Sequence, residues 1–253
     1  VLNTVLGLFM SVYVLRMVGQ TEYGVYQTMT SFLTYLSLLE FGTGTIMTRN
    51  ISLCKKDGSE IGKIKKNVST IWIITMVQSV LIGIVACVFF FLIDVIYSNT
   101  LSASQLADGK VLFVLVALRL IISYGTQTLN GIILGYEHYS ATTIIKLAYL
   151  IVRTGLIVGG LQIIPSAVLL VTIDLILSVI QFIVTALYCM INLNISISIS
   201  AFDHAIFKQS LPLALALLLQ TVVNMANGNV DKFVIGVLMS PEAVAVYSVA
   251  MYI

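Results

Sequence analysis

The chain has 253 residues, of which 59% are hydrophobic and 9% are charged, and its mean hydropathy is +1.05. Soluble domains carry about 25% charged residues, so this composition excludes an ordinary soluble domain and predicts an all-α, polytopic membrane protein. The net charge of +2 is small and scattered, which argues against nucleic-acid binding. The sequence has no phosphate-binding P-loop and no nucleophile elbow, and we expect neither an enzyme nor a cofactor or metal site.

Seven apolar stretches have the length of a membrane span, which is about 20 residues. They cover residues 1–17, 25–47, 68–93, 111–134, 142–164, 167–190 and 211–239, and an eighth begins near Ala243. Short polar segments rich in Gly, Ser, Asn or Pro separate them. The chain begins and ends inside apolar stretches, so we expect it to be part of a longer protein.

The loop between the second and third stretches is strongly basic. Its six cations stand against Asp57 and Glu60 and leave a net charge of +4; they are Arg49, Lys55, Lys56, Lys63, Lys65 and Lys66. The positive-inside rule predicts that this loop faces the cytoplasm. Counting spans from it places the amino end and the loops near His138 and His204 on the same side, in a multi-pass protein of the cytoplasmic membrane.

The chain divides into two unequal parts. Residues 192–201 alternate between polar and apolar side chains, and we interpret residues 192–210 as a cytoplasmic linker, with an interfacial helix as the alternative. This predicts a transmembrane lobe of about six helices over residues 1–191, and the truncated start of a second lobe, with one or two helices, over residues 211–253. Residues 18–26 resemble residues 238–247 with one residue inserted, and such internal repeats are common in transporters.

Polar side chains recur at helical spacing in five of the predicted spans. Stripes of this type line a water-filled cavity or, in the simpler interpretation, join helices through hydrogen bonds. The stripes are Gln27, Thr30, Thr34 and Ser37; Arg119, Ser123, Thr126, Gln127 and Asn130; Thr142, Lys146, Tyr149 and Arg153; Asp174, Ser178, Gln181 and Thr185; and Gln220, Asn224, Asn227 and Asp231.

The cationic members of these stripes are the strongest candidates for substrate contacts. A central charge costs about 2.5 to 3.5 kcal/mol in a membrane span, so several of them without a use are unexpected. We predict that Arg119, Lys146 and Arg153 meet an anionic group such as a phosphate or pyrophosphate, and that Gln127 and Asn130 lie beside them.

Acidic residues in the spans have two interpretations. A structural one pairs Asp174 with Arg153 or Arg119, which still leaves this half of the chain positive. The other assigns Asp174, Asp231 and Lys232 to a gate or to a coupling ion, H⁺ or Na⁺. Two small-residue pairs, Gly131 with Gly135 and Gly155 with Gly159, predict close helix packing; these are structural positions.

Several short segments carry a family resemblance. Residues 15–26, then Phe41-Gly42 and Arg49, resemble the opening of polysaccharide transporter family proteins, which are flippases of O-antigen and related lipid-linked oligosaccharides. Residues 231–236 and Ala245-Val246-Tyr247 are similar to the start of that family's second lobe. The family belongs to the multidrug/oligosaccharidyl-lipid/polysaccharide exporter superfamily.

The resemblance implies two lobes around a central cavity that opens alternately to each side, with cations that meet the lipid pyrophosphate. It adds Arg16 and Arg49 as basic residues near the ends of the first two spans. The implied partners are a lipid-linked oligosaccharide, the lipid bilayer and, in lipopolysaccharide assembly, a polysaccharide polymerase and glycosyltransferases.

Two other functions remain open. A cation-coupled antiporter of the multidrug and toxin-extrusion type uses acidic residues to exchange ions for cationic drugs, and the cationic stripes argue against it. A non-transporting membrane scaffold is disfavoured by the charges inside the spans.

Overall fold

The computed structural model describes residues 2–56, 61–98, 100–195, 201–228, 230–239 and 241–251. Every regular element in these ranges is helical, which confirms the all-α class. The elements are α1 (Leu2–Val18), α2 (Gln20–Thr34), the 3₁₀ helix η1 (Tyr35–Leu39), α3 (Thr43–Lys56), α4 (Ile61–Tyr97), α5 (Ala103–Gly135), α6 (Tyr139–Ile163), α7 (Ala167–Asn192), α8 (His204–Gly228), α9 (Val230–Leu238) and α10 (Pro241–Ala250).

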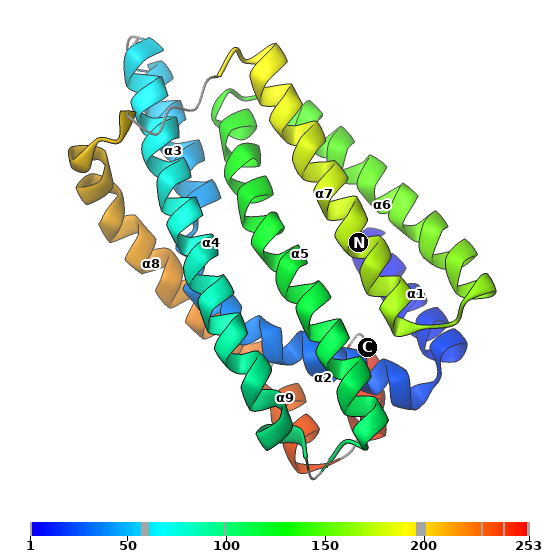
Figure 1. The fold of residues 1–253 in the computed structure, drawn as a ribbon. Coiled ribbons are helices and arrows are strands. Elements are labelled where there is room, and N and C mark those ends of the chain that lie inside the picture. Colours follow the sequence, from blue (N-terminus) through cyan, green and yellow to red (C-terminus); the bar gives the residue numbers. More distant parts are fainter. Residues whose placement is uncertain are drawn as a thin grey trace.

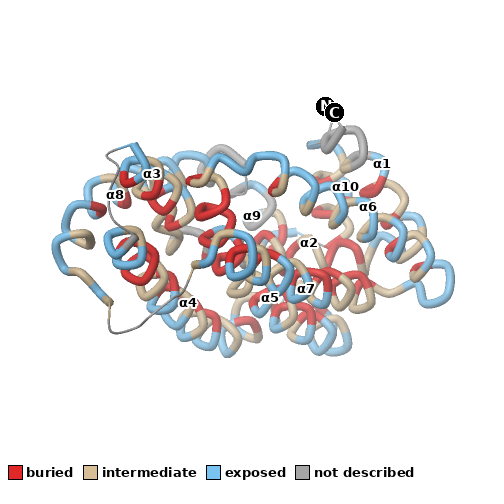
Figure 2. The backbone as a smooth tube through the Cα atoms, turned by 90° about the horizontal axis from the view of Figure 1, so that it is seen from above, coloured by how far each residue is buried: buried red, intermediate tan, exposed pale blue. Residues whose placement is uncertain are grey.

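Helix α5 is the centre of the bundle (Figure 1). It packs against α2, α3, α4, α6 and α7, and Figure 2 places much of the buried backbone along it and its neighbours. A capping box starts the helix: Ser102 Oγ accepts from the Gln105 amide, and Gln105 Oε1 accepts from the Ser102 amide. Side chains on α5 can therefore reach several neighbouring helices.

Within the described ranges, four helices are long and apolar enough to cross a membrane: Gly62–Tyr97, Tyr139–Ile163, Ala167–Asn192 and His204–Asn224. Their outer faces carry large apolar side chains that no other described helix covers. Phe91 on α4, Ile151 on α6 and Ile191 on α7 are 69%, 70% and 70% exposed. Such a surface suits lipid rather than water, as expected of a multi-pass membrane protein.

The prediction of one continuous second span over residues 25–47 is wrong. Helix α2 ends at Thr34, η1 follows, and α3 starts at Thr43. The break coincides with Gly42, whose φ is +64°, and a Cβ at this position would clash with Leu217 of α8. Glycine accepts that backbone conformation and leaves room for the neighbouring helix.

The second part of the chain also differs from the prediction. Helix α8 begins at His204, inside the expected linker, while residues 196–200 of that linker lie outside the described residues. The predicted seventh span, residues 211–239, corresponds to the end of α8 and to α9. The segment was correctly predicted to be apolar and helical, but composition alone does not reveal where one helix ends and the next begins.

The two segments that resemble each other in sequence lie against each other in space. Helix α10 packs along α2, where Thr21 Oγ1 donates a 2.8 Å hydrogen bond to Glu242 Oε1. Gly24 lies so close to the Pro241 backbone that a side chain there would clash. The two copies therefore form one of the contacts between the first part of the chain and the second.

The connections divide between the two ends of the bundle (Figure 1). The last turns of α3, α5 and α7 and the first turns of α4, α6 and α8 lie at one end, and the α6–α7 turn and the end of α4 with the start of α5 lie at the other. Exposed cations gather at the first end, where Lys55 and Lys56 finish α3 and Lys63, Lys65 and Lys66 start α4. This arrangement agrees with the span count; the assignment of this end to the cytoplasm stays a prediction.

Glycine packing was predicted correctly for one of two pairs. A Cβ at Gly131 would clash with the Gly44 carbonyl, and one at Gly135 would lie 2.7 Å from Ile51 Cβ, so α5 and α3 pack closely. At Gly155 and Gly159 an added Cβ would meet no described atom within 4 Å.

Candidate functional site

Three charged side chains meet where α5, α6 and α7 face one another. Arg153 Nε donates to Asp174 Oδ1 at 2.6 Å, and Arg153 Nη2 donates to Asp174 Oδ2 at 2.9 Å. Arg119 Nη1 lies 3.4 Å from Asp174 Oδ2. Asp174 is thus paired with both arginines that the sequence offered as alternatives, in what we call the Arg–Asp–Arg cluster.

The cluster keeps a positive charge. Two guanidinium groups against one carboxylate leave a net charge of +1 near the middle of three helices. The Asp174 side chain is only 1% exposed, whereas Arg119 and Arg153 are 34% and 25% exposed. A carboxylate buried this deeply needs close cationic partners, which the two arginines supply, and the exposed parts of the arginines remain open to an anion.

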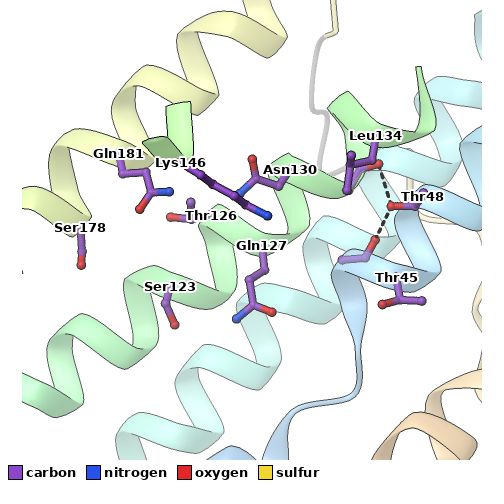
Figure 3. Close-up of a pocket in the computed structure, with 12 residues that line it drawn as sticks. Thr45, Thr48, Ser123, Thr126, Gln127, Asn130, Leu134, Lys146, Ser178 and Gln181 are labelled. Atoms are coloured by element: carbon purple, nitrogen blue, oxygen red, sulfur yellow. Dashed lines mark hydrogen bonds between the residues drawn. The ribbon is translucent and has the colours of Figure 1, made fainter. Parts of the chain in front are cut away.

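Figure 3 shows a polar cavity of about 330 Å³. Its lining residues Ser123 and Ser178 lie about one helical turn after Arg119 and Asp174 of the cluster. The cavity lies between α3, α5 and α7, and Lys146 of α6 reaches it. Nine of its lining residues are polar: Thr45, Thr48, Ser123, Thr126, Gln127, Asn130, Lys146, Ser178 and Gln181. The stripes predicted on the fourth, fifth and sixth spans therefore meet in one place, including the predicted contacts Gln127, Asn130 and Lys146.

The hydroxyls and the amides of the cavity differ in their hydrogen bonds. Ser123, Thr126 and Ser178 each donate to a carbonyl three or four residues earlier in their own helix. In contrast, Asn130 is 8% exposed and its Oδ1 has no hydrogen-bond partner within the described ranges. A buried amide oxygen without a partner costs about 1 to 3 kcal/mol, so it is a place where a ligand or water gains a hydrogen bond.

A second cavity, of about 490 Å³, lies on the other side of Lys146. It is formed by α1 and α6, and Tyr149 and Arg153 line it. Lys146 itself is exposed and forms no ion pair with any described residue. Lys146 and Arg153 thus bring positive charge to a space next to the polar cavity.

Other predicted site residues lie away from this region. Arg16, at the end of α1, and Arg49, on α3, are exposed, and neither lines the two cavities. Asp231, on α9, accepts a 2.6 Å hydrogen bond from Tyr247 Oη of α10. The side chain of Lys232 lies outside the described part of the structure. The geometry therefore brings together Arg119, Lys146, Arg153, Gln127, Asn130 and Asp174.

Sequence reasoning missed two residues of the cavity, Thr45 and Thr48, and one acidic residue outside it, Glu40. Thr45 and Thr48 join the cavity because the break at Gly42 turns α3 toward α5; one continuous span does not predict that direction. Glu40, between η1 and α3, is half-buried and pairs with no described cation. It lies within electrostatic range of the buried Tyr124 hydroxyl. An acidic residue inside an apolar stretch was the available signal.

No three His, Cys, Asp or Glu side chains in the described ranges come together as a metal site would require.

Comparison with known proteins identifies the family. Searches of the curated proteins and of the solved structures found no match. A family model described as "Polysaccharide biosynthesis protein" matches residues 1–253, the whole chain. This match confirms the resemblance carried by residues 15–26 and 231–236. The chain belongs to the polysaccharide biosynthesis protein family, the export (flippase) family of the multidrug/oligosaccharidyl-lipid/polysaccharide exporter superfamily.

Proposed function

We propose that the protein is a flippase that moves a lipid-linked oligosaccharide, or a related polysaccharide precursor, across the cytoplasmic membrane by alternating access. The Arg–Asp–Arg cluster is the observation that carries the proposal. Asp174 neutralises one arginine and leaves the second charge uncompensated, next to two cavities that Lys146 joins.

The charge of the site supports an anionic head group. A phosphate or pyrophosphate accepts hydrogen bonds from guanidinium and ammonium groups, and these bonds are about twice as strong as neutral ones. An ion pair that merely joins helices needs one cation for each anion, whereas this cluster and Lys146 supply three cations around one carboxylate. The excess of positive charge matches the negative charge of a diphosphate on a lipid.

The same charge argues against export of cationic drugs. A drug site needs an accessible carboxylate, and Asp174 is enclosed by two arginines and 1% exposed. Glu40 is the residue that favours a cation site, because it is half-buried and forms no ion pair with a described cation. We assign it, rather than Asp174, to the coupling ion. Glu40→Gln should remove the stimulation of transport by a proton or sodium gradient while cargo binding persists.

The test uses the full-length protein in its host, with the resident copy deleted. Arg119→Ala and Arg153→Ala should each reduce surface polysaccharide at least tenfold, since each removes about 1.5 to 3 kcal/mol of charge-assisted hydrogen bonding to the head group. Immunoblots of the membrane fraction check that the variants accumulate.

Lys110→Ala provides a matched control. Lys110 forms a 2.6 Å ion pair with Asp94 at one end of the bundle, far along α5 from the cavities. Its loss should leave export unchanged. Normal polysaccharide in both arginine variants at normal protein level would contradict the proposal. An unchanged drug-susceptibility panel in the deletion strain excludes drug export, and unchanged polysaccharide in that strain would favour a scaffold.

A further inference from the structure

We propose that the 330 Å³ polar cavity is a subsite for one uncharged sugar ring, next to an anion site formed by Arg119 and Arg153, with Lys146 at the boundary between the two. This inference rests on the proposed function and deepens it. It divides the cargo between two places: the diphosphate lies against the cations, and the first sugar lies among the amides and hydroxyls of α3, α5 and α7.

The lining has the composition that a sugar needs. Three primary amides, Gln127, Asn130 and Gln181, line the cavity, and the buried Oδ1 of Asn130 has no hydrogen-bond partner in the described ranges. Each amide offers a carbonyl acceptor and an NH₂ donor, which matches the hydroxyls of a sugar, since a hydroxyl both donates and accepts. No carboxylate lines the cavity, and Lys146 is its one cation.

The hydroxyls of the cavity face the ligand mainly as acceptors. Thr48 Oγ1 lies 3.0 Å from the Gly44 carbonyl and 3.1 Å from the Gly131 carbonyl, so its proton is used within the protein (Figure 3). Ser123, Thr126 and Ser178 use theirs in the same way. Their lone pairs are left for donors on the cargo, and the amides supply the complementary N–H groups.

A second polar set on α5 provides a contrast. Thr128 faces α3 and α4, where its Oγ1 lies 2.9 Å from both Thr43 Oγ1 and Thr75 Oγ1, and all three are buried. That set joins helices and is complete without a ligand. Asn130 lies on the same helix, but its Oδ1 has no such partner in the described ranges, and this difference separates a binding surface from helix-joining polar contacts.

Size and position agree with one sugar ring beside a diphosphate. Ligand pockets span about 300 to 1,000 Å³, and this cavity is at the small end, too small for a whole repeat unit. Arg119 and Ser123 are one helical turn apart on α5, which is about 6 Å. The lining has no aromatic ring, so binding rests on hydrogen bonds alone and stays weak enough for release, as transport requires.

The experiment compares two lipid probes on the purified full-length protein in lipid nanodiscs. One is geranylgeranyl diphosphate, and the other is the same lipid with N-acetylglucosamine on its terminal phosphate. Titration calorimetry should give about tenfold tighter binding of the sugar-bearing probe, the effect of one or two net hydrogen bonds. Gln127→Leu and Asn130→Leu should each abolish that preference and leave binding of the bare diphosphate unchanged.

Gln78→Leu is the matched control. It makes the same chemical change at another buried amide, on α4 and outside the cavity, and should keep the tenfold preference. Equal binding of both probes by the unmodified protein would overturn the sugar subsite and leave the proposed function intact. A preference that survives in both amide variants, or variants that lose both probes, would also overturn it. Failure of the unmodified protein to bind either probe would instead contradict the proposed function.

Discussion

Two cavities of similar size lie on opposite faces of α3 and have opposite chemistry. The polar cavity, about 330 Å³, takes Gly44, Thr45 and Thr48 from this helix. The other, about 360 Å³, takes Thr43 and Ile46 and continues between α4 and α8. Its other lining side chains are mostly apolar, including Ile71, Ile73 and Ile74 of α4, Phe207 of α8, and Phe202 just before α8.

Volume alone therefore does not distinguish a cargo site from a packing defect. Each cavity contains one deeply buried amide without a partner in the described ranges, Asn130 in the polar cavity and Gln78 in the apolar one. The two amides differ in the side chains that surround them. Asn130 has further amides, hydroxyls and a lysine around it, whereas Gln78 is almost alone among hydrocarbon side chains.

The largest effect should come from a substitution of Asp174, which holds the Arg–Asp–Arg cluster together. Asp174→Asn removes the charge that holds two arginines, and loss of one partner from a buried ion pair costs about 3 to 5 kcal/mol. We expect little folded protein in the membrane and a strongly lowered melting temperature in detergent. The control is Asp94→Asn, which breaks an exposed pair with Lys110 and should cost less than about 1 kcal/mol. Similar losses for both variants would contradict the role given to Asp174.

A smaller effect should follow from adding a methyl group where α3 and α5 pack closely. Gly131→Ala places a Cβ against the Gly44 carbonyl, and overpacking of this kind costs about 1 to 3 kcal/mol. Gly155→Ala adds a Cβ where no described atom lies within 4 Å, and should change stability by less than about 1 kcal/mol. Thermal unfolding in detergent compares the two. A destabilised Gly155→Ala with an unaffected Gly131→Ala would show that the helices are packed differently.

The smallest effect, and the most informative for the comparison, concerns the two unpaired amides. Gln78→Leu replaces a buried unsatisfied group by hydrocarbon of similar shape and should raise stability by about 1 kcal/mol without changing export. Asn130→Leu should be equally stable but should reduce export. Stability from melting curves and surface polysaccharide from the same strains separate the two outcomes. Export that is equally normal in both strains would remove the functional distinction between the cavities.

The sequence predicted the helical class, the family and the face on which polar residues gather, because hydropathy and helical spacing are local properties. Gln127 and Asn130 were found in this way. It did not predict that Asp174 pairs with both arginines, since a partner on another helix depends on packing. The direction of α3 was missed for a related reason: Gly42 lies inside the apolar stretch 25–47 and hardly changes its hydropathy, and the turn there carries Thr45 and Thr48 into the cavity.

The central claim is that the polar side of α3 is reached by water and cargo, whereas the apolar side is not. Labelling with a water-soluble thiol reagent tests it in membranes that contain the full-length protein without its native cysteines. Gln127→Cys should react, and should be protected by geranylgeranyl diphosphate bearing N-acetylglucosamine, while Ile74→Cys should stay unlabelled. Equal labelling at both positions, or an unreactive Gln127→Cys, would contradict the account.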